Sequence, residues 1–157
     1  MKLMFISSVA LTLLAFVSVN AQTTNPKPAK ADAAEIEAMQ GVWKQVEAVL
    51  GGAPVPQQVL EKITLKITGD KYEVEVGDEG NGDKGVTKLD TGATPKRIHI
   101  TSTEGANKGK TFLAIYEFIS ADSFRICYDL SGSNYPAKFE SAKDTMLYLV
   151  TYERQKK

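Results

Sequence analysis

Apolar and polar residues alternate along most of the chain from residue 42 onward, with the period of two that is typical of β-strands. The alternation is clearest in Ile63/Leu65/Ile67, Tyr72/Val74/Val76 and Phe124/Ile126/Tyr128, where most of the intervening residues are polar. Clusters of Gly, Asp and Pro, which favour turns, separate these runs. The pattern predicts eight strands: Val42–Leu50, Ile63–Thr68, Lys71–Val76, Gly85–Leu89, Arg97–Ser102, Lys110–Ile119, Ser123–Leu130 and Thr145–Arg154.

Short strands at near-regular spacing, joined by hairpin-length connections, predict an antiparallel up-and-down arrangement. Eight such strands are most simply closed into a barrel, because closure leaves no exposed sheet edge. The predicted fold class is therefore all-β, an eight-stranded antiparallel up-and-down barrel with a short N-terminal helix. That helix is predicted to begin at Asp32 and to end at Gly41, and a helical turn is predicted within Pro56–Lys62.

Three of the predicted strands depart from simple alternation. Trp43 lies on one face of the first strand, whereas Val46, Ala48 and Leu50 lie on the other, which predicts a bulge near Lys44 or Gln45. The runs from 112 to 119 and from 146 to 150 are apolar on both faces. Each of these two runs therefore either contains a bulge or is covered from outside, and the N-terminal helix is one candidate cover.

The first 21 residues have the pattern of a secretory signal peptide. Lys2 precedes a mostly apolar run, and Val19-Asn20-Ala21 supplies small residues before a predicted cut after Ala21. Hydroxyl residues interrupt the run, which argues against a membrane span. We therefore predict a signal peptide (1–21), a flexible linker (22–31) and one barrel domain (32–157), with no membrane span in the mature form. The predicted location is secreted or periplasmic.

Composition excludes several classes of protein. The 157 residues include 19 basic and 19 acidic side chains, so the chain is not a generally basic nucleic-acid binder. A single Cys excludes an internal disulfide, and a single His excludes His-rich zinc sites. We expect no metal, no cofactor and no nucleic-acid partner.

Short motifs that imitate catalytic or ion-binding sites fail on their surroundings. Lys108–Thr111 resembles a phosphate loop but precedes a predicted strand, not a helix, and Asp78–Asp83 lacks the spacing of a calcium loop. Ser131–Ser133 has no strand-to-helix turn around it, and His99 has no nucleophile placed near it in the sequence. Cys127 is predicted to be a buried structural thiol. We expect no catalytic residues and no enzymatic activity.

A family resemblance starts at Gln40-Gly41-Val42-Trp43, which matches the Gly-x-Trp signature of lipocalins. The chain also resembles a lipocalin-like family of small exported bacterial domains, mainly from planctomycetes, and the resemblance implies a barrel outside the cytoplasm but no activity. The stretches that carry it are Gly51–Pro56, Gly69–Tyr72, Thr103–Gly105, Lys108–Thr111, Ile115–Glu117 and Arg125–Tyr128.

The resemblance also implies a structural plug at one end of the barrel. In lipocalins the tryptophan closes that end, an arginine packs across its ring, and the glycine lets the backbone pass closely. By this likeness the plug consists of Gly41, Trp43 and Arg154, with Arg125 as the second choice for the arginine. Because an aromatic plug also forms the floor of a cavity, Trp43 is a candidate ligand contact as well.

Aromatic and cationic residues on the predicted strands are the remaining functional signal. The candidate ligand-binding residues are Trp43, Tyr72, Tyr116, Arg125, Tyr128 and Tyr148. If Phe124 points inward, as the alternation favours, Arg125 lies outside; the opposite parity would make Arg125 an internal partner for a carboxylate.

Two functions fit this pattern. The first is binding of a small apolar or amphipathic molecule inside the barrel. The alternative is a solidly packed barrel whose loops (Gly51–Pro56, Gly77–Lys84 and Gly132–Pro136) engage a cell-surface protein or a polysaccharide. A continuous cavity of roughly 300 Å³ or more would favour the first, and a filled interior the second.

Overall fold

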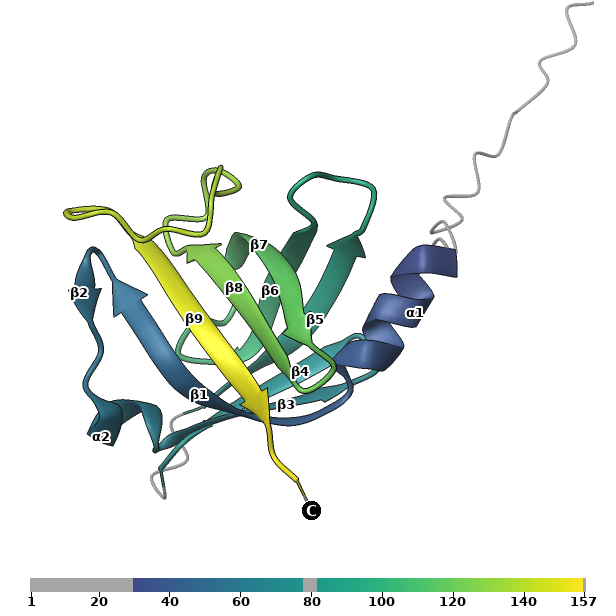
Figure 1. Ribbon diagram of the computed structural model, residues 1–157, viewed down its shortest axis with the longest axis horizontal. Helices are drawn as coiled ribbons and strands as arrows, with labels where there is room; N and C mark the ends of the chain where they lie inside the picture. Colours follow the sequence, from purple (N-terminus) through teal and green to yellow (C-terminus); the bar gives the residue numbers. More distant parts are fainter. Residues whose placement is uncertain (1–29, 78–81, 157) are drawn as a thin grey trace, which may run out of the picture.

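The structure, a computed structural model, describes residues 30–77 and 82–156, and within them eight antiparallel strands close into one barrel (Figure 1). Each barrel strand pairs with the next along the chain, and the last strand pairs with the first. The predicted fold class is confirmed. The barrel strands are β1 (Gly41–Leu50), β3 (Ile63–Thr68), β4 (Lys71–Val76), β5 (Asp83–Asp90), β6 (Arg97–Gly105), β7 (Thr111–Ser120), β8 (Ser123–Asp129) and β9 (Leu147–Arg154).

Three short elements accompany the barrel. Helix α1 (Lys30–Met39) begins two residues before the predicted start, so Asp32 lies in its first turn. Helix α2 (Gln57–Leu60) falls within the predicted helical turn. The two-residue strand β2 (Ala53–Pro54), which pairs with the end of β1, is too short to produce an alternation and was not predicted. The predicted signal peptide and nearly all of the predicted linker lie outside the described residues.

The inward face of the barrel carries the apolar positions of the alternation. The buried core includes Leu65, Ile67, Ile98, Phe124 and Ile126, each 9% exposed or less. In β1 the register with β9 shifts between Gln45 and Glu47, which places both Trp43 and Ala48 in the core. The predicted bulge is therefore present, one residue beyond Gln45.

The outer face of β7 and β8 is partly covered by the β8–β9 connection, residues 130–146. Ile115 and Cys127 face outward there but are only 1% and 0% exposed. The Arg97 guanidinium lies 4.7 Å from the centre of the Tyr135 ring, and the Cys127 Sγ lies 3.6 Å from the Glu140 carbonyl oxygen. This connection, not α1, therefore covers the doubly apolar run of β7.

The β7 run also contains an irregularity, a shift of register between Phe118 and Ser120. Both explanations offered for the run, a bulge and an outer cover, hold for this strand. In the run from 146 to 150, Met146 precedes β9 and is 58% exposed, while Val150 is fully buried in the core.

The two ends of the barrel differ in what lies across them. At one end α1 and the residue that follows it contact the β3–β4 and β5–β6 hairpins: the Gln40 side-chain amide donates to the Gly69 carbonyl at 3.2 Å, and the Thr91 hydroxyl donates to Asp32 at 2.8 Å. We call this the closed end. The opposite end carries the β6–β7 and β8–β9 connections together with the end of β4 and the start of β5, and we call it the mouth.

Candidate ligand-binding cavity

An indole blocks the closed end of the barrel. Trp43 is fully buried, its Nε1 donates to the Met39 carbonyl at 2.9 Å, and its ring makes a T-shaped contact with Phe124 with 4.7 Å between ring centres. The Arg154 guanidinium lies 4.1 Å from the centre of the indole, the pairing that the lipocalin resemblance implied. A cation over an aromatic ring contributes about 0.5–2 kcal/mol.

Gly41 makes the close approach of Arg154 possible. Its φ of +127° is a conformation that side chains disfavour, and a Cβ at this position would lie 2.8 Å from the Arg154 Nη1. The same guanidinium donates to the carbonyl oxygen of Gln40 and, at 2.9 Å, to that of Ala38. Any larger residue at position 41 would therefore separate the arginine from the backbone that it binds.

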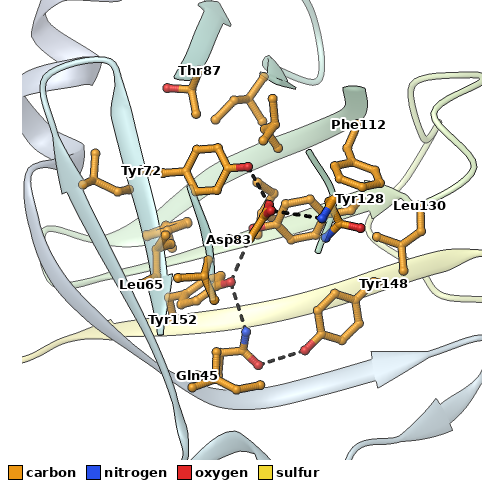
Figure 2. A pocket seen from close by; sticks show the side chains of 18 of the residues that line it. Gln45, Leu65, Tyr72, Asp83, Thr87, Phe112, Tyr128, Leu130, Tyr148 and Tyr152 are labelled. Carbon is orange, nitrogen blue, oxygen red and sulfur yellow. Dashed lines mark hydrogen bonds between the residues drawn. The ribbon is translucent and has the colours of Figure 1, made fainter. Parts of the chain in front are cut away.

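Above this plug lies a cavity of about 460 Å³ within the barrel (Figure 2). This volume falls within the range of roughly 300–1,000 Å³ that small-molecule sites occupy. Every barrel strand contributes to the lining, most of the lining side chains are apolar, and Met39 of α1 lies at the closed end. The apolar lining consists of Met39, Ile63, Leu65, Ile67, Val74, Val76, Ile98, Ile100, Phe112, Phe124, Ile126, Leu130 and Met146.

A chain of hydrogen bonds runs along one wall of the cavity, from β1 to β9 and β8. Figure 2 shows Gln45 between two phenols: the Tyr148 hydroxyl donates to its Oε1 at 2.8 Å, and its Nε2 donates to the Tyr152 hydroxyl at 3.2 Å. The Tyr128 hydroxyl lies 3.4 Å from that of Tyr152. These groups provide donors and acceptors inside an otherwise apolar wall.

Asp83 forms a second polar group at the start of β5. Its Oδ2 accepts from the Tyr72 hydroxyl at 2.8 Å, as Figure 2 shows, and its Oδ1 accepts from the Ser102 hydroxyl at 2.6 Å and from the Asn107 backbone N–H at 3.3 Å. The Tyr72 ring packs against Gly85, where a Cβ would lie 2.7 Å from the ring. The carboxylate is therefore held by donors from β4, β6 and the β6–β7 connection.

The phenols that line the cavity stay protonated well into the alkaline range. Burial raises the pKa of Tyr148 to about 12. Burial, and next the hydrogen bond to Asp83, raise the pKa of Tyr72. Burial also raises the pKa values of Tyr128 and Tyr152. At neutral pH all four are neutral hydroxyls that can both donate and accept.

The predicted ligand-binding residues fall into two groups. Tyr72, Tyr128 and Tyr148 line the cavity, while Trp43, Tyr116 and Arg125 do not. Tyr116 is fully buried on the inward face of β7, where burial and then the charge of the Glu35 carboxylate raise its pKa. Whether any of the six binds a ligand stays a prediction.

Arg125 takes the outer of the two positions considered. Its guanidinium pairs with the Glu117 carboxylate and lies 4.5 Å from the centre of the Phe139 ring. The inward residues of β8 are Phe124, Ile126 and Tyr128, which all line the cavity. Arg125 therefore does not provide this wall with the internal cation that the opposite parity would have offered to a carboxylate ligand.

Polar lining residues outside the candidate set include Gln45, Asp83 and Tyr152. Gln45 lies two residues after Trp43 and so on the same face of β1, a signal that was available in the sequence. Asp83 was assigned to a glycine-rich turn, because β5 was predicted to begin only at Gly85. Tyr152 lies among strand aromatics and differed from Tyr148 in nothing that the sequence showed.

The residues set aside as catalytic or metal candidates have structural surroundings. The Ser131 hydroxyl donates to Asp129 at 2.6 Å within a turn, where backbone amides of Ser131, Ser133 and Asn134 also bind that carboxylate. Burial alone would raise the pKa of Asp129, but these hydrogen bonds together lower it. Cys127 is fully buried, and burial raises its pKa. Residues 30–77 and 82–156 contain no cluster of metal-binding side chains.

No protein-family model and no curated protein sequence matches the chain. The barrel agrees with a lipocalin-like fold. The chain thus resembles lipocalins in its strand arrangement and in the contact between Trp43 and Arg154. Among the described residues, no helix is long and apolar enough to cross a membrane.

Proposed function

We propose that this protein is a non-enzymatic, lipocalin-like binding protein that holds a small apolar or amphipathic molecule inside its barrel. The observation that supports the proposal best is the 460 Å³ cavity with its apolar lining. The alternative, a solidly packed interaction module, requires side chains to fill that space.

The polar groups on the wall suit an amphipathic ligand better than a pure hydrocarbon. Gln45, Tyr128 and Tyr148 offer hydroxyl and amide groups near the middle and mouth of the cavity. The closed end offers only the apolar side chains of Met39, Ile67, Phe124 and their neighbours, apart from the Thr87 hydroxyl. A ligand with a polar group at one end and an apolar tail would match both halves.

Export belongs to the same proposal. The pattern of the first 21 residues and the likeness to exported bacterial domains both support a secreted or periplasmic location. The protein recovered from the exported fraction of its host would then begin at Gln22, which N-terminal peptide mapping can test. Recovery of a chain that still begins at Met1 would contradict the predicted cleavage.

Titration with the neutral lipophilic dye N-phenyl-1-naphthylamine tests ligand binding. The dye should bind with a rise in fluorescence in the natural protein, and Val74→Phe should weaken binding at least tenfold, because Val74 lines the cavity. Glu75→Phe is the matched control: the neighbouring residue of β4 is exposed and lies on the opposite face, so dye binding should not change.

Two further results bear on this proposal. A small molecule that co-purifies from the host, seen by native mass spectrometry, would support it and identify the ligand. No rise in dye fluorescence together with no co-purifying molecule would overturn it. Equal loss of binding in Val74→Phe and Glu75→Phe, with both variants folded by circular dichroism, would place the dye outside the cavity.

A further inference from the structure

Among the described residues that line the cavity, Asp83 is the single carboxylate and Lys110 the single cation. Both lie toward the mouth, Asp83 at the start of β5 and Lys110 just before β7. The two side chains do not pair with each other, since the ion pairs among the described residues join other groups. Among the described residues, the donors that the Asp83 carboxylate meets are all neutral: the Tyr72 and Ser102 hydroxyls and the Asn107 backbone N–H.

The hydrogen bonds to Asp83 leave one side of the carboxylate available. Its Oδ1 accepts two bonds, from Ser102 and from Asn107, whereas among the described residues its Oδ2 accepts one, from Tyr72. A carboxylate oxygen has room for about two donors, so Oδ2 can accept one more. An anion that is held in place, unpaired by a cation and able to accept a further bond favours a donor with a positive charge.

Lys110 does not offset this preference. Its ammonium lies at the exposed rim, where water screens its charge, and it donates to the Asn107 side-chain oxygen at 3.4 Å. Asp83 is partly buried, and the Ser102 hydroxyl that holds it belongs to a residue only 1% exposed. The field inside the cavity mouth therefore follows the carboxylate more than the lysine.

We propose that Asp83 gives the cavity a preference for amphipathic molecules with a protonated amine as their polar group, over carboxylates of the same length. This inference rests on the ligand binding proposed above and assigns the class of ligand. The ammonium would donate to Oδ2 of Asp83 near the mouth, and the apolar tail would extend toward Met39 and Phe124 at the closed end.

Three probes of equal chain length test the preference: dodecylamine, dodecanol and dodecanoate, each measured by displacement of N-phenyl-1-naphthylamine below its micelle concentration. In the natural protein the amine should bind about tenfold more tightly than the alcohol, which corresponds to about 1.4 kcal/mol, and the carboxylate should bind least tightly. Asp83→Asn should abolish the difference between amine and alcohol and leave the affinity for dodecanol within about twofold.

Lys110→Gln is the control, because it removes the positive charge at the mouth and leaves Asp83 in place. It should leave the preference for the amine intact, because the preference comes from Asp83. Carboxylate binding tighter than amine binding in the natural protein would overturn the proposal, and this comparison stands even if Asp83→Asn does not fold. An amine preference that survives in folded Asp83→Asn would also overturn it.

Failure of this inference is distinct from failure of the proposed function. If the dye binds and is displaced equally by all three probes, the barrel binds ligands but Asp83 does not select among them. If the dye itself does not bind in the cavity, the proposed function fails and the assignment of Asp83 fails with it.

Discussion

The closed end and the mouth of the barrel are held by different kinds of contact. At the closed end Arg154 joins several segments: its guanidinium contacts the Trp43 ring, the carbonyl oxygens of Ala38 and Ala121 and, at 3.0 Å, the Asp122 carboxylate. One side chain thus ties α1 and the β7–β8 hairpin to the first and last strands. Such a hub is stabilising only while each partner stays in place.

The mouth has no comparable hub among the described residues. Met146 at its rim is 58% exposed, and the polar groups that line it, such as Tyr148 and Asp83, form separate short networks. Side chains here line the cavity, so they make fewer contacts with one another than core residues do. The comparison indicates that the closed end supplies stability, which leaves the mouth free to present a ligand site.

The largest test of this comparison removes the plug itself. Trp43→Ala should lower the free energy of unfolding by about 3–5 kcal/mol, because it leaves a cavity at a fully buried position and removes the ring under Arg154. Met146→Ala at the exposed rim should change it by less than about 0.5 kcal/mol. Urea denaturation of both variants measures the difference, and similar losses at the two positions would refute the assigned division of roles.

A smaller effect is expected when the arginine keeps its charge but loses its planar group. Arg154→Lys should cost about 1–3 kcal/mol, since an ammonium cannot stack on Trp43 and bind the surrounding carbonyl oxygens at once. Arg125→Lys is the matched control: that arginine lies over the Phe139 ring and pairs with Glu117 on the outer face, where both charged side chains are at least 40% exposed. It should cost less than about 1 kcal/mol. Equal costs would show that the closed-end contacts are no stronger than a surface ion pair.

Much of the closed end could be predicted from the sequence. Alternation with period two gives the strands, since each barrel strand has one face in the core, and Gly41 and Trp43 mark where the first strand begins. The pairing of Trp43 with Arg154 came from the family resemblance and was not worked out from the spacing of residues. The bulge in β1 could be predicted because Trp43 and Ala48 must both face the core.

The mouth was harder to predict, for physical reasons. Asp83 sits among glycines and polar residues, so nothing in the local pattern separates an inward carboxylate from a solvated turn. The cover over Ile115 comes from residues 130–146, which have no periodicity, and it depends on side chains such as Tyr135 that reach a strand distant in the sequence. Whether the interior is empty is decided by the summed side-chain volumes of eight strands, and no single run of residues reports that sum.

The smallest test concerns a single hydroxyl near the mouth. Tyr148→Phe removes the donor to Gln45 and should lower the free energy of unfolding by only about 1 kcal/mol at neutral pH.

The effect of Tyr148→Phe should also depend on pH: burial raises the pKa of Tyr148 to about 12, whereas an unfolded tyrosine has a pKa of about 10. Between these values the unfolded chain releases the proton and the folded chain keeps it, so the free energy of unfolding falls as pH rises. The free energy of unfolding, measured by denaturation from pH 9 upward, should therefore fall less steeply with pH in Tyr148→Phe. The difference in slope should correspond to about one proton. Parallel curves for the two proteins would mean that this hydroxyl is in contact with water in the folded state, and that the mouth is wider than the structure indicates.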